Sequence, residues 1–233
     1  MPERREFWLQ PRRQAWLADT LFRGWAWASR LGTLGAGTRY AQRFQAVGAG
    51  SAFSFPPGPA LGERWIRIGD GSLIGPGVAL SAGMWVDEPL DPPAGWVVRI
   101  GDRCNIGRGS AIVGRVGIDI GDDVTTGPNV YVTDHNHRYA NPDIPIARQW
   151  VDAEPVRIGA GCWLGAGAVV LPGTTLGRNV VVAAGSVVRG EVPDHAVVAG
   201  VPARIVRRRT DAGEWDPPIE ETPGGGSAPE GWL

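Results

Sequence analysis

A six-residue period runs through most of this chain and restricts the folds that it can adopt. Over the longest stretch, from Ile158 to Val188, an aliphatic residue returns at every sixth position and is usually followed by a small one. Four positions after each aliphatic residue comes a small or β-branched side chain, such as Cys162 or Thr174. An α-helix repeats at about 3.6 residues and a strand alternates every two, so neither keeps a strict spacing of six. Coils of short strands do, because equivalent aliphatic side chains stack from coil to coil. The period therefore predicts a β-solenoid with a column of Ile, Val and Leu as its core.

Shorter runs with the same period precede this stretch, and the phase slips between them. The slips predict a Pro-rich loop at 87–98, a small offset near Ile118 and a long loop at 133–156. Insertions in a solenoid become loops on one face, which is commonly the binding face. The long loop also carries His135 and His137. The shorter runs are Ile68, Ile74, Leu80 and Val86, then Ile100, Ile106 and Ile112, then Ile120, Thr126 and Val132.

The two ends of the chain lack the period. Residues 1–60 are predicted to form an N-terminal helical and capping region, 61–209 the solenoid, and 210–233 a disordered tail rich in Pro and Gly. Between Glu6 and Leu31 one apolar face recurs at helical spacing. We expect this helix to cap the open end of the solenoid, because solenoid ends must be covered. A helix lying on a membrane surface, which Trp and Arg also suit, is the alternative. The residues of the apolar face are Leu17, Leu21, Trp25 and Ala28.

Composition narrows the possible partners and compartment. A formal net charge of -1 leaves no basic footprint for nucleic acid. The two cysteines, Cys104 and Cys162, lie in unrelated contexts and favour a reduced, cytoplasmic compartment. The N-terminal arginines have no uninterrupted apolar stretch behind them, so we expect neither a secretion signal nor a membrane-spanning helix.

The repeat between about Ile66 and Arg209 resembles the hexapeptide-repeat acyltransferases. The segments "GPNVYVTDHNHRYANPDIPI" and "EPVRIGAGCWLGAGAVVLPG" are similar to the branch that includes galactoside, maltose and xenobiotic acetyltransferases. The resemblance implies an all-β fold, a left-handed parallel β-helix, assembled as a homotrimer with active sites at subunit interfaces. It further implies transfer of an acetyl or longer acyl group from acyl-CoA to a hydroxyl of a sugar or similar small molecule, with no metal required.

The histidines of the long loop are the candidates for proton transfer. In the branch resembled here a catalytic histidine follows "PNV" at a fixed distance, and the matching position is His137. A neutral imidazole, which titrates near pH 6.5, suits removal of the proton from an attacking hydroxyl. His135 is expected to help bind the acceptor or to orient the loop. A carboxylate should fix the tautomer of the base, and the sequence leaves three candidates: Asp134, Asp152 and Glu154.

The coenzyme A strip is also implied by the resemblance. "VAAGSVV" and "VAGVPARIVR" match the segments that line the pantetheine and nucleotide in the family. Arg189 stands near a position where many relatives carry Lys, and it could replace that charge. The Gly165-Ala166 turn is expected to supply backbone N–H donors to the oxyanion. The coenzyme-binding candidates are Trp163, Gly165, Ala166, Ala184, Arg189, Arg204 and Arg207.

Three rival interpretations can be weighed from the sequence. Cys162 occupies a small corner position of the repeat and is expected to pack there rather than carry an acyl group, which leaves direct transfer in a ternary complex. A γ-type carbonic anhydrase would hold zinc with three histidines, but the spacing of His135, His137 and His195 lacks the long-spaced pair of those enzymes. A non-catalytic interaction module would have no use for the "DHNH" loop. The acceptor and the acyl length stay open, since Trp85 and Trp96 could line an acyl pocket or belong to the core.

Overall fold

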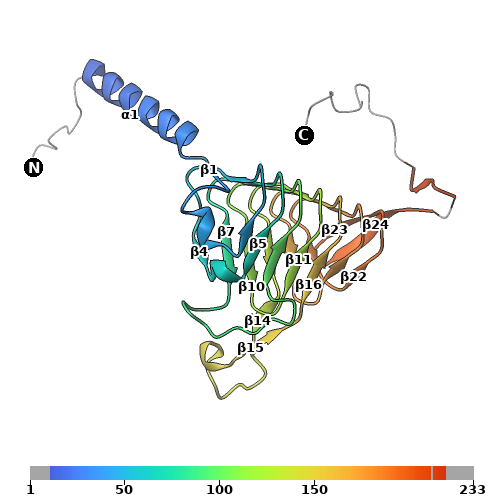
Figure 1. Cartoon of the computed structure of the whole chain (residues 1–233). Helices are drawn as coiled ribbons and strands as arrows, with labels where there is room; N and C mark the ends of the chain where they lie inside the picture. Colours follow the sequence, from blue (N-terminus) through green and yellow to red (C-terminus); the bar gives the residue numbers. More distant parts are fainter. Residues whose placement is uncertain (1–10, 211, 219–233) are drawn as a thin grey trace, which may run out of the picture.

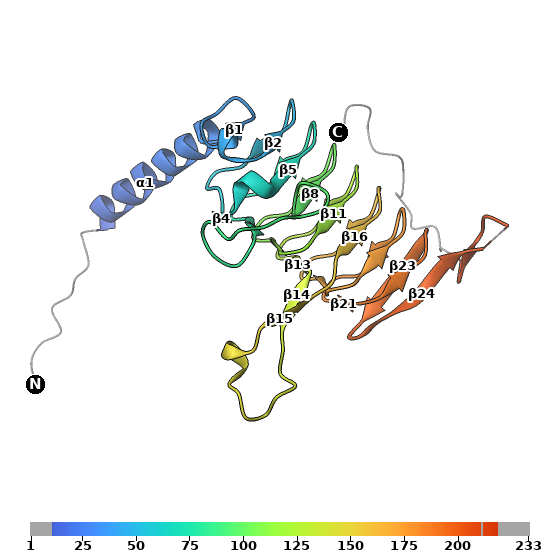
Figure 2. The ribbon, with the colours of Figure 1, turned by 60° about the horizontal axis from the view of Figure 1, so that its bottom comes forward.

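The structure is a computed structural model that describes residues 11–210 and 212–218 of the chain. Short strands wind into a triangular prism whose three sides are sheets, here named I, II and III in the order in which the chain passes them (Figures 1 and 2). Sheet I is ten-stranded, sheet II six-stranded and sheet III seven-stranded. The fold is a left-handed parallel β-helix, as the resemblance implied.

Each sheet is a ladder of equivalent strands from successive coils. Sheet I contains β1 (Leu34–Gly35), β3 (Ala52–Phe53), β6 (Leu73–Ile74), β9 (Asn105–Ile106), β12 (Thr125–Thr126), β17 (Trp163–Leu164), β20 (Val181–Val182), β23 (Ala196–Gly200), β24 (Ala203–Arg209) and β25 (Trp215–Asp216). Sheet II contains β4 (Ala60–Leu61), β7 (Ala79–Ala82), β10 (Ala111–Gly114), β13 (Tyr131–Thr133), β18 (Val169–Val170) and β21 (Val187–Val188). Sheet III contains β2 (Ala46–Val47), β5 (Ile66–Ile68), β8 (Val98–Ile100), β11 (Ile118–Ile120), β16 (Val156–Ile158), β19 (Thr175–Leu176) and β22 (Glu191–Val192).

The core is the column that the six-residue period predicted. From Ile158 to Val188 every aliphatic residue of the period is at most 2% exposed. Coils join through backbone bonds, such as the one from Gly165 N–H to the Val182 oxygen at 2.7 Å. At Gly165 a Cβ would lie 2.5 Å from the backbone nitrogen of Ala184, so only glycine allows the coils to approach this closely. Burial of each aliphatic side chain stabilises the fold by roughly 1.5–3 kcal/mol.

The solenoid begins earlier than the predicted residue 61. β2, β3 and β4 already pair in parallel with β5, β6 and β7, so the first coil starts at Ala46. The end of the column is closed by three aromatic rings from the preceding segment and from β3. Tyr40 and Phe53 meet edge to face at 5.1 Å between ring centroids, and Phe44 and Phe53 lie 5.0 Å apart. The short 3-10 helix η1 (Ala41–Arg43) lies between Tyr40 and Phe44 in the chain.

The predicted helix exists, but it does not cap the solenoid. α1 (Pro11–Leu31) leaves the first coil and projects away from it in both views (Figures 1 and 2). Near its C-terminal end, Trp25 contacts Phe55 of the solenoid, at 5.5 Å between ring centroids. The capping interpretation is therefore wrong for α1, because residues 40–53 already cover the column. Residues 6–10 of the predicted helix lie outside the described residues. No helix formed by the described residues is long and apolar enough to cross a membrane.

The C-terminal boundary also moves. Within the predicted tail, β25 (Trp215–Asp216) pairs antiparallel with β24, so this part of the tail is an ordered extension of sheet I. The rest of the predicted disorder, at 211 and 219–233, lies outside the described residues.

Both large insertions predicted from the phase slips are loops on the prism. The first runs from the end of β7 to the start of β8, next to the 3-10 helix η2 (Glu63–Trp65). The second, here called the His loop (134–155), leaves after β13 in sheet II and returns at β16 in sheet III (Figure 2). It opens with an antiparallel hairpin of β14 (His135–His137) and β15 (Val151–Ala153) and contains η3 (Ile146–Arg148).

Candidate active site

The base of the His loop is anchored by the carboxylate of Asp134. This side chain is fully buried and accepts hydrogen bonds from the backbone N–H groups of Arg115, Val116 and Gly117, all at 2.8–2.9 Å. It also lies 2.8 Å from Nδ1 of His135. Burial alone would raise the pKa of Asp134, but these hydrogen bonds outweigh it and hold the pKa below its ordinary value. Asp134 is therefore an ionised, buried anchor that orients His135.

His137 is placed differently from its neighbour. The His135 side chain is only 13% exposed, whereas His137 is exposed and lines a hollow of about 230 Å³. Glu154 and Arg189 line the same hollow, although they lie 17 and 52 positions further along the chain. The other lining residues are Asn136, Tyr139, Asp152, Leu171 and Pro172.

The structure separates the three carboxylates that the sequence left open. Asp134 is bonded to His135. Asp152 faces Arg138, with 2.5 Å between Oδ1 and Nε. The backbone of Glu154 is fixed by bonds to Asp134 and Gly173, and its side chain borders the His137 hollow. Glu154 thus shares a hollow with His137, and it belongs neither to the Asp134–His135 pair nor to the Asp152–Arg138 pair.

Three of the seven predicted coenzyme residues, Trp163, Arg204 and Arg207, lie on strands of sheet I. Trp163, Val181 and Val197 stand in register on successive strands, and Val197 pairs with Arg207 on β24. A β-bulge between Val197 and Val198 gives β24 one extra residue. Arg204 therefore pairs with Ala199 while Arg207 pairs with Val197, and both arginines share the outer face of the sheet. Sequence spacing alone, three residues apart on a strand, would have placed them on opposite faces.

The row of Trp163, Val181, Val197 and Arg207 on sheet I ends in a buried N–H donor without a hydrogen-bond partner among the described residues. Nε of Arg207 is shielded from solvent and has no hydrogen-bond partner among the described residues. Such a group is costly unless a ligand or another chain satisfies it. The Nη1 of Arg204 is bonded to its neighbouring Ala203 oxygen at 2.9 Å.

The turn predicted to hold the oxyanion is only partly available. The N–H of Gly165 is bonded to Val182 between coils, so it cannot also serve as an oxyanion donor. Ala166 and Ala184 are exposed at equivalent turns of adjacent coils, on the edge between sheets I and II. The expectation for Gly165 as a donor is therefore wrong, while Ala166 remains placed for that role.

The predicted base and the predicted coenzyme strip lie on different edges of the prism. The turn at Leu171 and Pro172, which borders the His137 hollow, joins sheet II to sheet III. The turns of Ala166 and Ala184 join sheet I to sheet II. Arg189, predicted with the coenzyme strip, lies instead in the His137 hollow. One chain therefore does not bring the two groups together.

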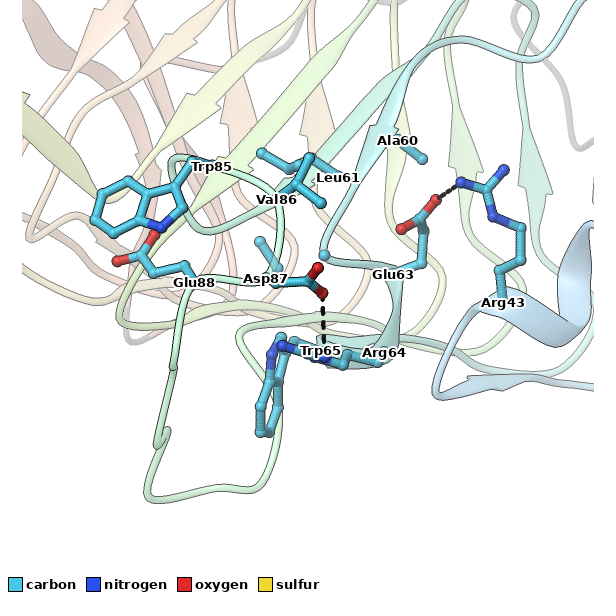
Figure 3. Close-up of a pocket in the computed structure, with 12 residues that line it drawn as sticks. Arg43, Ala60, Leu61, Glu63, Arg64, Trp65, Trp85, Val86, Asp87 and Glu88 are labelled. Carbon is cyan, nitrogen blue, oxygen red and sulfur yellow. Dashed lines mark hydrogen bonds and ion pairs between the residues drawn. The ribbon is translucent and has the colours of Figure 1, made fainter.

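Two aromatic residues of uncertain role occupy separate hollows rather than the core. Trp85 is half exposed and lines a hollow of about 230 Å³ with Trp65 (Figure 3). Arg43 pairs with Glu63 on one wall of this hollow, and Arg64 with Asp87 on another, at 3.5 Å (Figure 3). Trp96 lines a different hollow beside Pro155 and Arg157.

A contact that sequence reasoning missed ties the first loop to the His loop. The rings of Trp85 and Trp150 lie 6.0 Å apart, and the guanidinium of Arg115 stands 5.0 Å from the Trp150 ring. Arg115 also pairs at 3.2 Å with Glu88, which is 5% exposed. The backbone N–H of Arg115 also donates to Asp134. Arg115 therefore supports the His loop both where it leaves the solenoid and along its side. No local sequence pattern predicts the contacts among Trp85, Glu88, Arg115 and Trp150, because these residues come from three coils.

The remaining candidate chemistry can be placed briefly. Cys162 is buried at a corner, where burial raises the pKa of its thiol to about 11, so it is not an activated nucleophile. His195 lies at the edge between sheets III and I, away from the His loop hairpin in sequence and fold. Among residues 11–210 and 212–218, no group of three or more His, Cys, Asp or Glu is arranged to hold a metal ion.

Two family models match the coils that flank the His loop. The model described as bacterial transferase hexapeptide (six repeats) matches residues 155–190. The model described as hexapeptide repeat of succinyl-transferase matches residues 97–134.

Curated relatives extend the match. A probable acetyltransferase of Mycobacterium tuberculosis is 39% identical over 146 residues, which is 63% of this chain and 43% of that protein. A putative lipopolysaccharide biosynthesis O-acetyl transferase of Escherichia coli is 42% identical over 98 residues, 39% of this chain and 50% of that protein. The galactoside O-acetyltransferase of Escherichia coli is 32% identical over 54% of this chain and 62% of its own length. The chain thus spans about half the length of these relatives.

Solved structures agree on the fold. The N-acyltransferase AntD from Bacillus cereus, in complex with dTDP and 3-hydroxybutyryl-CoA, has a TM-score of 0.60 and 23% identity. The match covers 74% of this chain and 87% of that one.

Proposed function

Because the chain belongs to the hexapeptide-repeat acyltransferase family, we propose that it transfers an acyl group from acyl-CoA to a hydroxyl of a sugar or sugar-like molecule. Relatives named as O-acetyltransferases, one of them acting on galactosides, support the acceptor class. AntD, crystallised with an acyl-CoA, carries the same fold and supports the donor class at the level of the fold only.

The observation that carries the proposal is the position of His137. The solenoid interrupts its repeat to present this imidazole, exposed, in a hollow shared with Glu154 and Arg189. In the proposed step His137 takes the proton of the acceptor hydroxyl as its oxygen attacks the thioester carbonyl. The carbon–sulfur bond then breaks, and the coenzyme leaves as a thiol after receiving the proton back. The transfer is direct, since Cys162 is buried and its thiol pKa is raised.

His135 acts as a positioning residue in this scheme. Its ring is held by the buried Asp134 and is largely covered, so it fixes the first residue of β14 rather than meeting the acceptor. His137 follows two residues later on the same strand face and inherits that placement. Glu154 is our choice for the carboxylate that orients His137, since it borders the same hollow.

The donor would lie along the row on sheet I. A pantetheine chain suits the Trp163–Val181–Val197 row, and the nucleotide phosphates suit the arginines that end it. Arg207 pairs with Val197 at the end of this row, where the charge of its guanidinium suits a phosphate. We expect Arg207→Ala to weaken coenzyme A binding by about ten- to a hundred-fold. Arg204→Ala should weaken it by a smaller factor. Isothermal titration measures this, with Arg157→Ala on sheet III as the matched control; equal affinity for all three variants would place the nucleotide elsewhere.

The site is completed by a second copy in this proposal. The outer row of sheet II carries mainly small and uncharged side chains, whereas the outer row of sheet III is mainly charged. A copy in parallel orientation, in a threefold arrangement, would bring its sheet I/II edge against the sheet II/III edge that bears His137. The row on sheet II is Ala79, Ala111, Tyr131, Val169 and Val187, and the row on sheet III is Arg67, Arg99, Asp119, Arg157, Thr175 and Glu191.

Release of free thiol from a panel of acyl-CoA donors with sugar acceptors tests the function. His137→Ala should cut kcat by roughly 10²–10⁴ with little change in coenzyme affinity. His135→Ala should lower kcat by a smaller factor, because His135 positions His137, and should leave the acceptor KM nearly unchanged. Mixing His137→Ala chains with Arg207→Ala chains, at a donor concentration too low to saturate Arg207→Ala, tests the shared site, since re-formed oligomers should regain part of the activity. If His135→Ala is the inactive variant and His137→Ala keeps its rate, the base is misassigned; if no acceptor hydroxyl releases thiol, the activity itself is wrong.

A further inference from the structure

α1 carries more exposed apolar surface than any other element of the described chain. Trp16, Leu21, Phe22 and Trp27 are 64%, 72%, 71% and 67% exposed. Exposed apolar groups on this scale mark a surface that meets something other than water. The end of the solenoid is not what covers them, because Tyr40, Phe44 and Phe53 close it and α1 projects outward (Figures 1 and 2).

The side chains of α1 divide into two faces. At about 100° per residue, Leu17, Leu21, Trp25 and Phe22 fall within one broad arc. Arg23 and Arg30 lie together on the opposite side, with Asp19 beside them. Trp16 and Trp27 fall beside the arginines, on the side of the helix away from this arc.

This arrangement favours an anionic lipid surface over a second copy of the helix. A seam between copies needs only a narrow apolar stripe, and it would leave Phe22 or Trp25 in water. Between residues 13 and 31 the chain has Arg13, Arg23 and Arg30 against the single acid Asp19, so copies of α1 would repel one another. The same charges attract anionic headgroups, and the broad apolar arc suits the acyl region below them.

We propose that α1 lies in the plane of an anionic membrane surface, with its Leu17–Leu21–Trp25 face in the acyl region and its arginines at the headgroups. α1 then attaches the solenoid to the membrane through Gly32, the first residue after the helix, whose N–H is bonded to the Ala28 oxygen. The attachment is peripheral, and it does not depend on the acyltransferase assignment.

Flotation of the full chain with vesicles tests the proposal. We expect binding to phosphatidylcholine vesicles that contain phosphatidylglycerol, weaker binding to phosphatidylcholine alone, and a loss of the difference at high salt. Leu21→Glu and Phe22→Glu should each lower the partition coefficient about tenfold or more. Ile146→Glu changes an apolar residue on the His loop that is 56% exposed, and it should leave the partition coefficient unchanged.

The controls make each outcome decisive. Circular dichroism and sedimentation velocity without lipid establish that the variants keep the fold and assembly of the parent. A folded parent chain that does not float with anionic vesicles overturns the proposal, as does equal binding to neutral and anionic vesicles. If Leu21→Glu instead dissociates an oligomer and no chain floats, α1 is a contact between copies.

Discussion

The coils and the His loop of this protein are held in opposite ways. In the coils, each inward aliphatic residue is covered by its equivalents above and below, and backbone groups bond from coil to coil. The His loop has few buried side chains and is fixed mainly at its base, by Asp134 and the β14–β15 hairpin, and at its side by Arg115 and Trp150. Stability therefore resides in the repeat, whereas the candidate chemistry depends on a few polar anchors.

Removing one inward side chain tests the first half of this comparison. Ile120 is fully buried and in register with Ile100 and Ile158, so Ile120→Ala should lower the free energy of unfolding by about 2–5 kcal/mol. Ile146, exposed in the His loop, is the matched control, and Ile146→Ala should change it by no more than about 0.5 kcal/mol. Urea denaturation measures both. Similar losses at the two positions would contradict the division.

Replacing the anchor of the loop should have the next largest effect. Asp134→Asn turns an amide N–H₂ toward backbone donors and should cost about 1.5–3 kcal/mol. Hydrogen exchange at Val116 and Gly117 should accelerate as well. Asp152→Asn breaks only the exposed pair with Arg138 and should cost under about 1 kcal/mol. If the two variants lose equal stability, the anchor has been misidentified.

The same anchor gives the loop a dependence on acid. The pKa of Asp134 is lower in the folded chain than its ordinary value of 3.8, so its stabilising contribution is present above that value. The contribution is lost as the pH falls from about 4 through the folded pKa. The stability difference between the parent and Asp134→Asn should thus shrink below about pH 4. A difference that grows in acid would contradict this sign.

The smallest effect is expected from the side support of the loop. Trp150→Ala removes the ring contact with Trp85 and the cation–π contact with Arg115, each worth about 0.5–1.5 kcal/mol in the open. Unfolding of the whole chain should change little, while limited proteolysis within 138–150 should speed up. A double-mutant cycle with Trp85→Ala should give a coupling of about 0.5–1 kcal/mol. A coupling near zero would mean that the rings merely lie close.

Sequence reasoning was strongest where the requirement repeats and weakest where partners come from separate coils. The period predicted which residues point inward, from Ile68 to Val188, because each coil imposes the same demand as the last, but it was wrong at Val86, which is 73% exposed in the first loop. It placed the first coil too late, since the strands at Ala46 and Ala52 lack the aliphatic pattern. It assigned α1 to the wrong neighbour, because an amphipathic pattern records a face but not what covers it.

The sequence by itself determined the solenoid and the place where it is interrupted, since these follow from spacing along the chain, and the family resemblance singled out His137 within the interruption. The tertiary structure decided the rest. Three backbone N–H groups, 17 to 19 residues earlier in the chain, fix the carboxylate of Asp134 in the position where it contacts the His135 ring. Arg204 and Arg207 share a face only because of a bulge. Arg189 lines the same hollow as His137, and the coenzyme strip lies on another edge of the prism. In a coiled chain, the edge on which a residue lies depends on its position within its coil and not on its distance in sequence.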